Sequence, residues 1–333
     1  MKKILNDPEN YVDETLEGLV AAHPDIYRLA GEEGRVVARA APGKAGKVGI
    51  VSGGGSGHLP VFTGYVGTGL LDACAIGQVF ASPSADQMAD AMRAADQGAG
   101  VLRLYGNYGG DVMNFDMAGD LVEMDDIDSA TVLLADDVAS APPEEAEKRR
   151  GVAGMVYAFK IAGAAAEAGL DLAGVTRVAQ KTADACRSVG AALSSCTVPQ
   201  AGKPTFEIGE DEMEMGMGIH GEPGVWRDKL RPADVIADEM MDRLLADIEI
   251  GKGDRVSVLV NSLGATPHEE LYILYRIVQK RLHAAGAEVV MPLVGRYATS
   301  MEMTGVSFTL CKLDDELEGY LKAPCECAFW SVR

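Results

Sequence analysis

The order in which apolar runs and helix-like segments follow one another constrains the fold of this 333-residue chain most strongly. Short apolar runs that read as strands lie at residues 48–52, 73–76, 101–104 and 131–135. Segments with helical periodicity, at residues 84–97 and 112–122, lie between them. Ser84 and Gln87 stand at the spacing of a helix N-cap with a capping box. This alternation predicts a parallel sheet with helices on its faces.

The pattern restarts in the second half of the chain. Two alanine-rich stretches, at 153–168 and 172–193, are predicted to be helical. Further strands are predicted at 195–198, 213–219, 256–261, 289–293 and 307–310, with helices at 233–248, 268–285 and 314–321. We therefore predict an α/β protein of two α/β domains, 1–190 and 191–333, each with a mostly parallel or mixed sheet flanked by helices. The acidic stretch 136–150 is predicted to be a surface loop or hinge.

Charge and composition exclude several classes of protein. The net charge of −20 opposes binding to nucleic acid or to an anionic membrane. No segment is apolar for long enough to span a bilayer, and the N-terminus turns polar too early for a signal peptide, so a cytoplasmic location is expected. The six cysteines show no zinc-site spacing and are predicted to be buried, reduced thiols, with no metal bound.

A glycine-rich segment, SGGGSGH at residues 52–58, follows the first predicted strand. Gly54, Gly55, Ser56 and Gly57 would let the backbone turn and point N–H groups at an oxygen-rich ligand, and His58 could move a proton near neutral pH. The segment matches neither the P-loop nor the dinucleotide fingerprint. A tight turn with a bystander histidine is the alternative to a small-ligand site.

Two other segments carry side chains that could take part in catalysis or binding. Residues 105–111 contain Gly106 and end in Asp111, which reads as a helix N-cap or as a proton acceptor beside a helix N-terminus. His220 is flanked by glycines that leave its ring open, so it could bind a metal, relay a proton or act as a nucleophile, or simply occupy a surface turn.

These pieces, in this order, resemble the substrate-binding K subunits of dihydroxyacetone kinases over nearly the whole chain. The most specific segments are 52–58 (SGGGSGH), 80–84 (FASPS), 110–115 (GDVMNF), 209–214 (GEDEME), 218–224 (GIHGEPG) and 263–267 (LGATP).

The resemblance implies that the ring nitrogen of His220 adds to the ketone of the substrate to give a covalent hemiaminal. Only carbonyl compounds could be captured in this way, which excludes glycerol. By the same resemblance, Asp111 accepts the proton of the reacting primary hydroxyl, and His58 assists by hydrogen bonding or proton relay. Backbone groups of residues 54–57 and the position of Gly106 would contact the substrate.

The resemblance also implies a partner and an assembly. The chain itself is expected to bind no cofactor, while a separate L-type subunit carries ATP or ADP with magnesium. The chain ends where an L domain would begin, so it is expected to need this partner, and a homodimer is expected. A ketose-binding coactivator or sensor without kinase activity is the alternative. A dehydrogenase is disfavoured because the dinucleotide fingerprint fails.

The chain departs from the common family pattern at three positions. Leu59 and Phe62 replace a carboxylate and an imidazole, and Gly106 replaces a lysine that contacts the substrate. The loss of the lysine is predicted to open space and to remove a hydrogen-bond donor. A four-carbon ketose such as erythrulose is therefore expected beside dihydroxyacetone.

Overall fold

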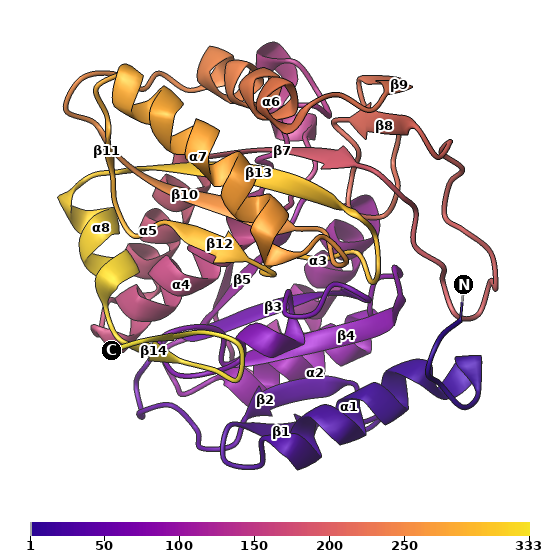
Figure 1. Ribbon diagram of the computed structural model, residues 1–333. Coiled ribbons are helices and arrows are strands. Elements are labelled where there is room, and N and C mark those ends of the chain that lie inside the picture. The colour runs from indigo at the N-terminus through magenta and orange to yellow at the C-terminus, as the bar shows by residue number, and fades with distance from the viewer. Residues whose placement is uncertain (1) are drawn as a thin grey trace.

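The computed structural model describes residues 2–333 and contains two large sheets with helices between them and outside them. In Figure 1 the first sheet lies below the second, with the chain passing upward through α4 and α5. The alternation of strands and helices predicted from the sequence is confirmed, and so is the α/β class.

The first sheet has six strands in the order β1-β2-β4-β3-β5-β6. Its strands are β1 (Tyr27–Ala30), β2 (Val36–Arg39), β3 (Gly49–Ser56), β4 (Ala73–Val79), β5 (Val101–Gly106) and β6 (Ser129–Leu134). The strands β4, β3, β5 and β6 run parallel, while β1 and β2 add an antiparallel edge. The parallel strands are apolar because helices cover both of their faces.

The helices α2 (Ala85–Ala95) and α3 (Gly109–Glu123) cover one face of the first sheet. Ser84 and Gln87 form the predicted capping box at the start of α2. The other face packs on α4 (Gly154–Glu167) and α5 (Leu172–Ala185), whose buried side chains belong to a core shared with the second sheet. A single apolar core therefore joins the two sheets through α4 and α5.

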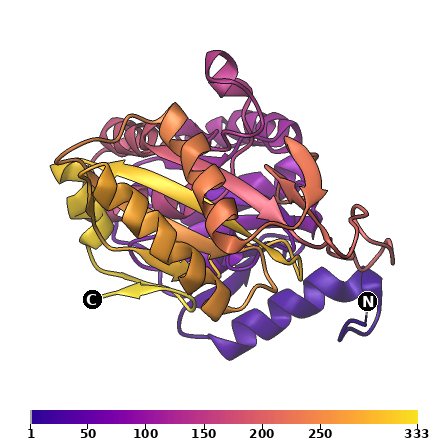
Figure 2. The same cartoon turned by 45° about the horizontal axis from the view of Figure 1, so that its top comes forward.

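The second sheet has the order β11-β10-β13-β7-β8-β9, with β12 also paired to β10. Its strands are β7 (Cys186–Ala192), β8 (Glu212–Met215), β9 (Trp226–Lys229), β10 (Arg255–Ser262), β11 (Glu288–Val289), β12 (Leu293–Gly295) and β13 (Gly305–Leu313). Most of its pairs are antiparallel, and only β11 and β12 run parallel to β10. Figure 2 looks onto α6 (Ala233–Asp247) and α7 (His268–Ala284), which cover the outer face of this sheet.

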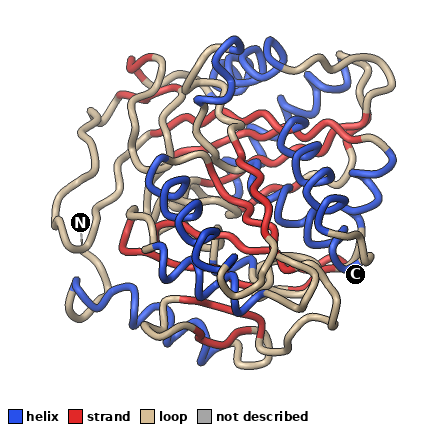
Figure 3. The backbone as a smooth tube through the Cα atoms, turned by 180° about the vertical axis from the view of Figure 1, so that it is seen from behind, coloured by secondary structure: helices blue, strands red, loops and turns tan. Residues whose placement is uncertain are grey.

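The remaining elements precede, connect or follow those of the two sheets. They are the helix α1 (Tyr11–Ala22), the short 3-10 helices η1 (Pro8–Asn10), η2 (Thr63–Tyr65) and η3 (Pro143–Lys148), the helix α8 (Asp315–Lys322), and the hairpin of β14 (Cys325–Glu326) and β15 (Ser331–Val332). Seen from behind in Figure 3, the two ends of the chain lie on opposite sides of the molecule. The C-terminal hairpin packs into the core of the first sheet through Cys325, Cys327 and Trp330.

Several predicted boundaries were wrong. The predicted helix 172–193 is α5 followed by β7, whose alanines pair in the middle of the second sheet, so tertiary burial overrides their helical preference. The predicted domain limit at residue 190 therefore falls inside β7. Residues 195–198 form no strand, and the strand predicted at 213–219 ends at Met215, because Gly216 turns the chain at a φ of +82°. The strand predicted at 289–293 is split into β11 and β12.

The acidic stretch 136–150 is exposed in its middle, at residues 142–145, 147 and 148, as its composition predicts, but its two ends are buried. Asp136, Asp137 and Arg149 are all buried, with 2% or less of each residue exposed. The carboxylate of Asp136 accepts hydrogen bonds from the Ser188 hydroxyl and from two backbone N–H groups at the start of α4. This segment therefore ties the first half of the chain to β7.

The cysteines match their prediction, since all six are buried and reduced. Within residues 2–333, no helix combines the length and the hydropathy that crossing a bilayer requires.

Candidate active site

The candidate residues converge where β3 and β5 separate. The ladder between these strands ends at the pair of Val51 and Arg103, whereas β3 continues alongside β4 as far as Ser56. The connections after β3 and β5 then lead to strands on opposite sides, so this is a topological switch point at the carboxyl edge of a parallel sheet, where α/β proteins commonly bind ligands in a crevice. His58 follows β3 and Asp111 lies just beyond β5, so both reach this crevice.

His58 is fully buried and is held by the second half of the chain. Its Nδ1 lies 2.7 Å from the carbonyl oxygen of Thr299, and because a carbonyl only accepts, Nδ1 carries the proton. The ring stacks on Phe80 with 4.9 Å between centroids. Burial, with a smaller contribution from His220, lowers the pKa of His58 to about 3, so the ring is neutral. Its Nε2 is buried without a hydrogen-bond partner and can accept one from a ligand.

His220 lies beside His58, with 4.8 Å between the ring centroids. Its Nδ1 is 2.8 Å from Oε1 of Glu222, and its backbone N–H donates to Oε2 of the same carboxylate at 2.9 Å. Although burial alone would raise the pKa of Glu222, the hydrogen bonds from His220 outweigh it and lower the pKa to about 2. The ionised carboxylate holds the proton on Nδ1, which leaves the lone pair on Nε2 free to act as a nucleophile.

Asp111 lies in the first turn of α3, whose N-cap is Tyr108, so the N-cap role predicted for Asp111 was wrong. Only 6% of the residue is exposed, and its Oδ1 has no hydrogen-bond partner. Burial raises the pKa of Asp111 to about 6, partly offset by the hydroxyl of Ser82 and by His220. A buried, unpartnered carboxylate with a raised pKa is suited to accept a proton near neutral pH.

The glycine-rich segment is the end of β3 rather than a loop, which corrects the prediction. A Cβ on Gly54 would lie 2.2 Å from the ring of Phe62, and one on Gly55 would lie 2.7 Å from backbone atoms next to Phe80. Only Gly57 takes a positive φ, +106°. These glycines therefore let two aromatic rings close in on the crevice.

The carbonyl oxygens at the end of the glycine segment are already occupied. Ser56 accepts from the backbone N–H of Phe80, and Gly57 accepts from that of Met301 at 2.7 Å. The second contact fixes the end of β3 to the second half of the chain.

Gly106, the last residue of β5, is packed more tightly than predicted. A Cβ there would lie 3.2 Å from the ring of Tyr108 and 3.3 Å from the sulfur of Met155. The space expected from the missing lysine is thus bordered closely by Tyr108.

Sequence reasoning did not single out the aromatic walls of the site or the partner of its histidine. Tyr108 meets the His220 ring edge-on at 4.9 Å, and Phe80 does so at 5.4 Å. The hydroxyl of Tyr108 is buried without a partner. Glu222 could have been found from its position two residues after His220, whereas the two rings come from distant loops.

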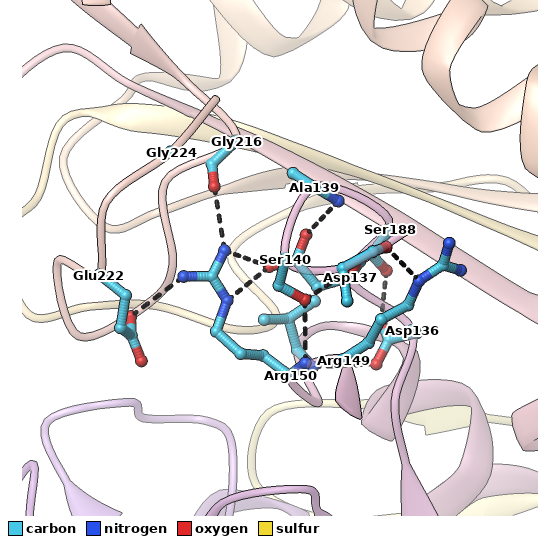
Figure 4. A network of polar contacts seen from close by, with 12 residues as sticks. Asp136, Asp137, Ala139, Ser140, Arg149, Arg150, Ser188, Gly216, Glu222 and Gly224 are labelled. Carbon is cyan, nitrogen blue, oxygen red and sulfur yellow. Dashed lines mark hydrogen bonds and ion pairs between the residues drawn. The ribbon is translucent and has the colours of Figure 1, made fainter. Parts of the chain in front are cut away.

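Arg150 connects the His220 loop to the buried acidic segment (Figure 4). Its guanidinium donates to Asp137 and to the carbonyl oxygen of Gly216, and lies 4.0 Å from Oε2 of Glu222. The residues between 2 and 333 include no group of three or more His, Cys, Asp or Glu side chains placed to hold a metal ion.

Comparison with known proteins identifies related sequences over the whole chain. Residues 17–329 match the model of the Dak1 domain. The dihydroxyacetone-binding subunit DhaK of PTS-dependent dihydroxyacetone kinase 1 from Listeria innocua is 47% identical over 99% of this chain and 100% of its own length. The L-erythrulose 1-kinase of Mycolicibacterium smegmatis is 44% identical over 98% of this chain and 57% of its own length.

Solved structures agree with this relationship. The dihydroxyacetone kinase of C. freundii has a TM-score of 0.90 at 32% identity, over 99% of this chain and 60% of that chain. The dihydroxyacetone kinase operon co-activator Dha-DhaQ has a TM-score of 0.88 at 32% identity, over 96% of this chain and 98% of that chain.

Proposed function

Because the chain belongs to the Dak1 family, we propose that it is the ketose-binding subunit of a two-component kinase of the dihydroxyacetone type. The single observation that carries this proposal is the pairing of His220 with Glu222. It leaves an unprotonated ring nitrogen beside two further unpartnered groups, Nε2 of His58 and Oδ1 of Asp111.

The capture step follows from the protonation of these groups. The lone pair on Nε2 of His220 attacks the carbonyl carbon, and the electrons of the C=O bond move to oxygen, which takes up a proton to become a hydroxyl. The oxygen takes this proton from water, and the Nδ1 proton passes through the Glu222 carboxylate to the hydroxide left behind. Glu222 therefore ends ionised, and the adduct is a neutral hemiaminal. Polyols lack the carbonyl carbon and cannot react.

The captured ketose then needs its primary hydroxyl aligned and deprotonated. Asp111 is the proposed base, because its carboxylate is ionised above pH 6 and has an oxygen without a partner. His58 stays neutral and has its proton on Nδ1, so its Nε2 accepts a hydrogen bond from a substrate hydroxyl. Holding the nucleophilic oxygen in place lowers the entropic part of the barrier.

The phosphoryl donor is assigned to a partner subunit, with ATP or ADP and magnesium. The sequence has no P-loop, and a Listeria relative that this chain matches over its whole length is named as a subunit of a kinase. The substrate is proposed to be dihydroxyacetone or a four-carbon ketose, because the related proteins are named for both.

Intact-protein mass spectrometry tests this proposal. The chain is incubated with dihydroxyacetone, erythrulose, a five-carbon ketose and glycerol, beside the His220→Ala variant. A mass increment is expected for the short ketoses and for neither glycerol nor the variant. An increment that persists in His220→Ala would place capture elsewhere. With ATP and no partner, no phosphorylated product is expected.

A ketose-binding co-activator is the second candidate, favoured by the structural similarity to Dha-DhaQ over nearly all of both chains. The two functions differ in the partner assay. A kinase subunit yields ketose phosphate when it is mixed with an L-type subunit and its phosphoryl donor, whereas a co-activator captures ketose without turnover.

A further inference from the structure

Arg150 belongs to none of the segments that would touch a ketose, yet its guanidinium reaches behind the His220 loop. Its Nη2 donates to the carbonyl oxygen of Gly216 at 3.0 Å, and its Nε donates to Asp137 at 2.9 Å. The side chain is only 14% exposed, and that of Asp137 is 3% exposed. The guanidinium is thus fixed from both sides within the protein.

The glycine at position 218 shows how closely this contact is built. A Cβ there would lie 2.1 Å from Oε2 of Glu222 and 2.6 Å from Nη1 of Arg150. Any side chain at Gly218 would separate the guanidinium from the carboxylate. The loop therefore leaves room for both groups, which stand 4.0 Å apart.

The charge of Arg150 is already balanced by Asp137. The guanidinium therefore acts on Glu222 mainly as a fixed group that keeps its carboxylate in place. Glu222 needs such a position because its side chain is 30% exposed, and both hydrogen bonds that its carboxylate accepts within residues 2–333 come from the same residue, His220. A carboxylate that swings away would release the proton on Nδ1 and let the ring exchange tautomers.

We propose that Arg150, anchored by Asp137, is a positioning residue that holds Glu222 and the His220 loop so that the nucleophilic nitrogen of His220 keeps its free lone pair. This inference rests on the proposed function only in naming the ketose as the electrophile. The acidic segment 136–150 thereby gains a role in preparing the capture step.

The neighbouring arginine provides a matched control. Arg149 is also buried, with 1% of its side chain exposed, and forms a two-pronged ion pair with Asp247 of α6. In Figure 4 the two guanidinium groups point to opposite sides. Replacement of Arg149 removes a buried ion pair of equal kind without touching the His220 loop.

The test compares Arg150→Met, Arg150→Lys and Arg149→Met with the natural sequence in the full chain. Nitrogen-15 NMR of labelled histidine reports the tautomer of His220 without any ketose, and mass spectrometry reports the rate of adduct formation with dihydroxyacetone. Thermal melting shows that each variant is folded. A positioning error of about 1 Å costs about 100-fold in rate.

In Arg150→Met we expect a second His220 population with the proton on Nε2, and adduct formation slowed ~10- to 100-fold. Arg150→Lys should be intermediate, since one ammonium cannot reach Asp137, Gly216 and Glu222 together. Arg149→Met should lose stability but keep the natural tautomer and rate. A folded Arg150→Met protein that keeps the natural tautomer of His220 and the natural rate of adduct formation would overturn the proposal. If the natural chain forms no adduct at all, the proposed function fails, while the tautomer comparison still decides the role of Arg150.

Discussion

The substitution Asp111→Asn should abolish turnover and at the same time stabilise the protein. The pKa of Asp111 is raised from 3.8 to about 6, mainly by burial. Since one pKa unit corresponds to about 1.4 kcal/mol, keeping this carboxylate ionised costs the folded state about 3 kcal/mol. Asparagine has nearly the same shape and carries no charge, so it avoids this cost.

The gain in stability should depend on pH in a defined direction. Above about pH 6 the buried carboxylate is ionised in the folded chain and the full cost is present. Below pH 3.8 it is protonated in both the folded and the unfolded chain, and the cost vanishes. The free energy of unfolding of Asp111→Asn should therefore exceed that of the natural chain at pH 8, and the difference should shrink as the pH falls from 6 toward 4.

Urea unfolding at pH 8 and pH 4.5 measures this difference, and Asp120→Asn is the control, because Asp120 is exposed on the same helix. Adduct formation on His220 should survive in Asp111→Asn, while phosphorylation with the partner subunit falls by at least ~100-fold. Equal stability of Asp111→Asn and the natural chain at pH 8, or a gain that is the same at both pH values, would refute the electrostatic reasoning.

Three further outcomes are expected. Gly54→Ala should destabilise the protein by about 1–3 kcal/mol in urea unfolding, because its Cβ would lie 2.2 Å from a ring carbon, whereas Gly18→Ala, on an open helix face, should not. Glu222→Gln should slow adduct formation on His220 ~10-fold or more by mass spectrometry, since the neutral amide no longer fixes the Nδ1 proton; an unchanged rate would remove the carboxylate from the mechanism. The rate of phosphorylation should fall below about pH 6, and His58→Asn should lower the rate without moving that midpoint, since the pKa of His58 is lowered to about 3; a midpoint that moves would assign the titration to His58.

The sequence predicted the order of elements well, because helix periodicity and short apolar runs are local signals. It misjudged β7, whose alanines form a central strand only because β13 and β8 lie on either side of it. It also took the glycines before His58 for a loop. Their real constraint is the close approach of Phe62 and Phe80, which no local pattern reveals.

The candidate site shows the same division between local and distant signals. The carboxylate that accepts the Nδ1 proton of His220 belongs to Glu222, only two residues further along the chain, so this pair can be found from the sequence. The contact between Arg150 and the His220 loop joins segments that only the fold brings together. The acidic composition of residues 136–150 predicts a solvated loop. This holds for the exposed middle of the stretch but not for its ends, because composition alone does not distinguish exposed charges from buried, paired ones.

The continuous core through α4 and α5 bears on whether the two sheets could move apart during a catalytic cycle. A motion that separated the two sheets, like the lobes of a hinged kinase, would split the apolar contacts that α4 and α5 make with both of them. Under the proposed function, the exclusion of water from the reaction would therefore fall to the docking of the partner that carries the phosphoryl group, and not to a hinge closure of this chain.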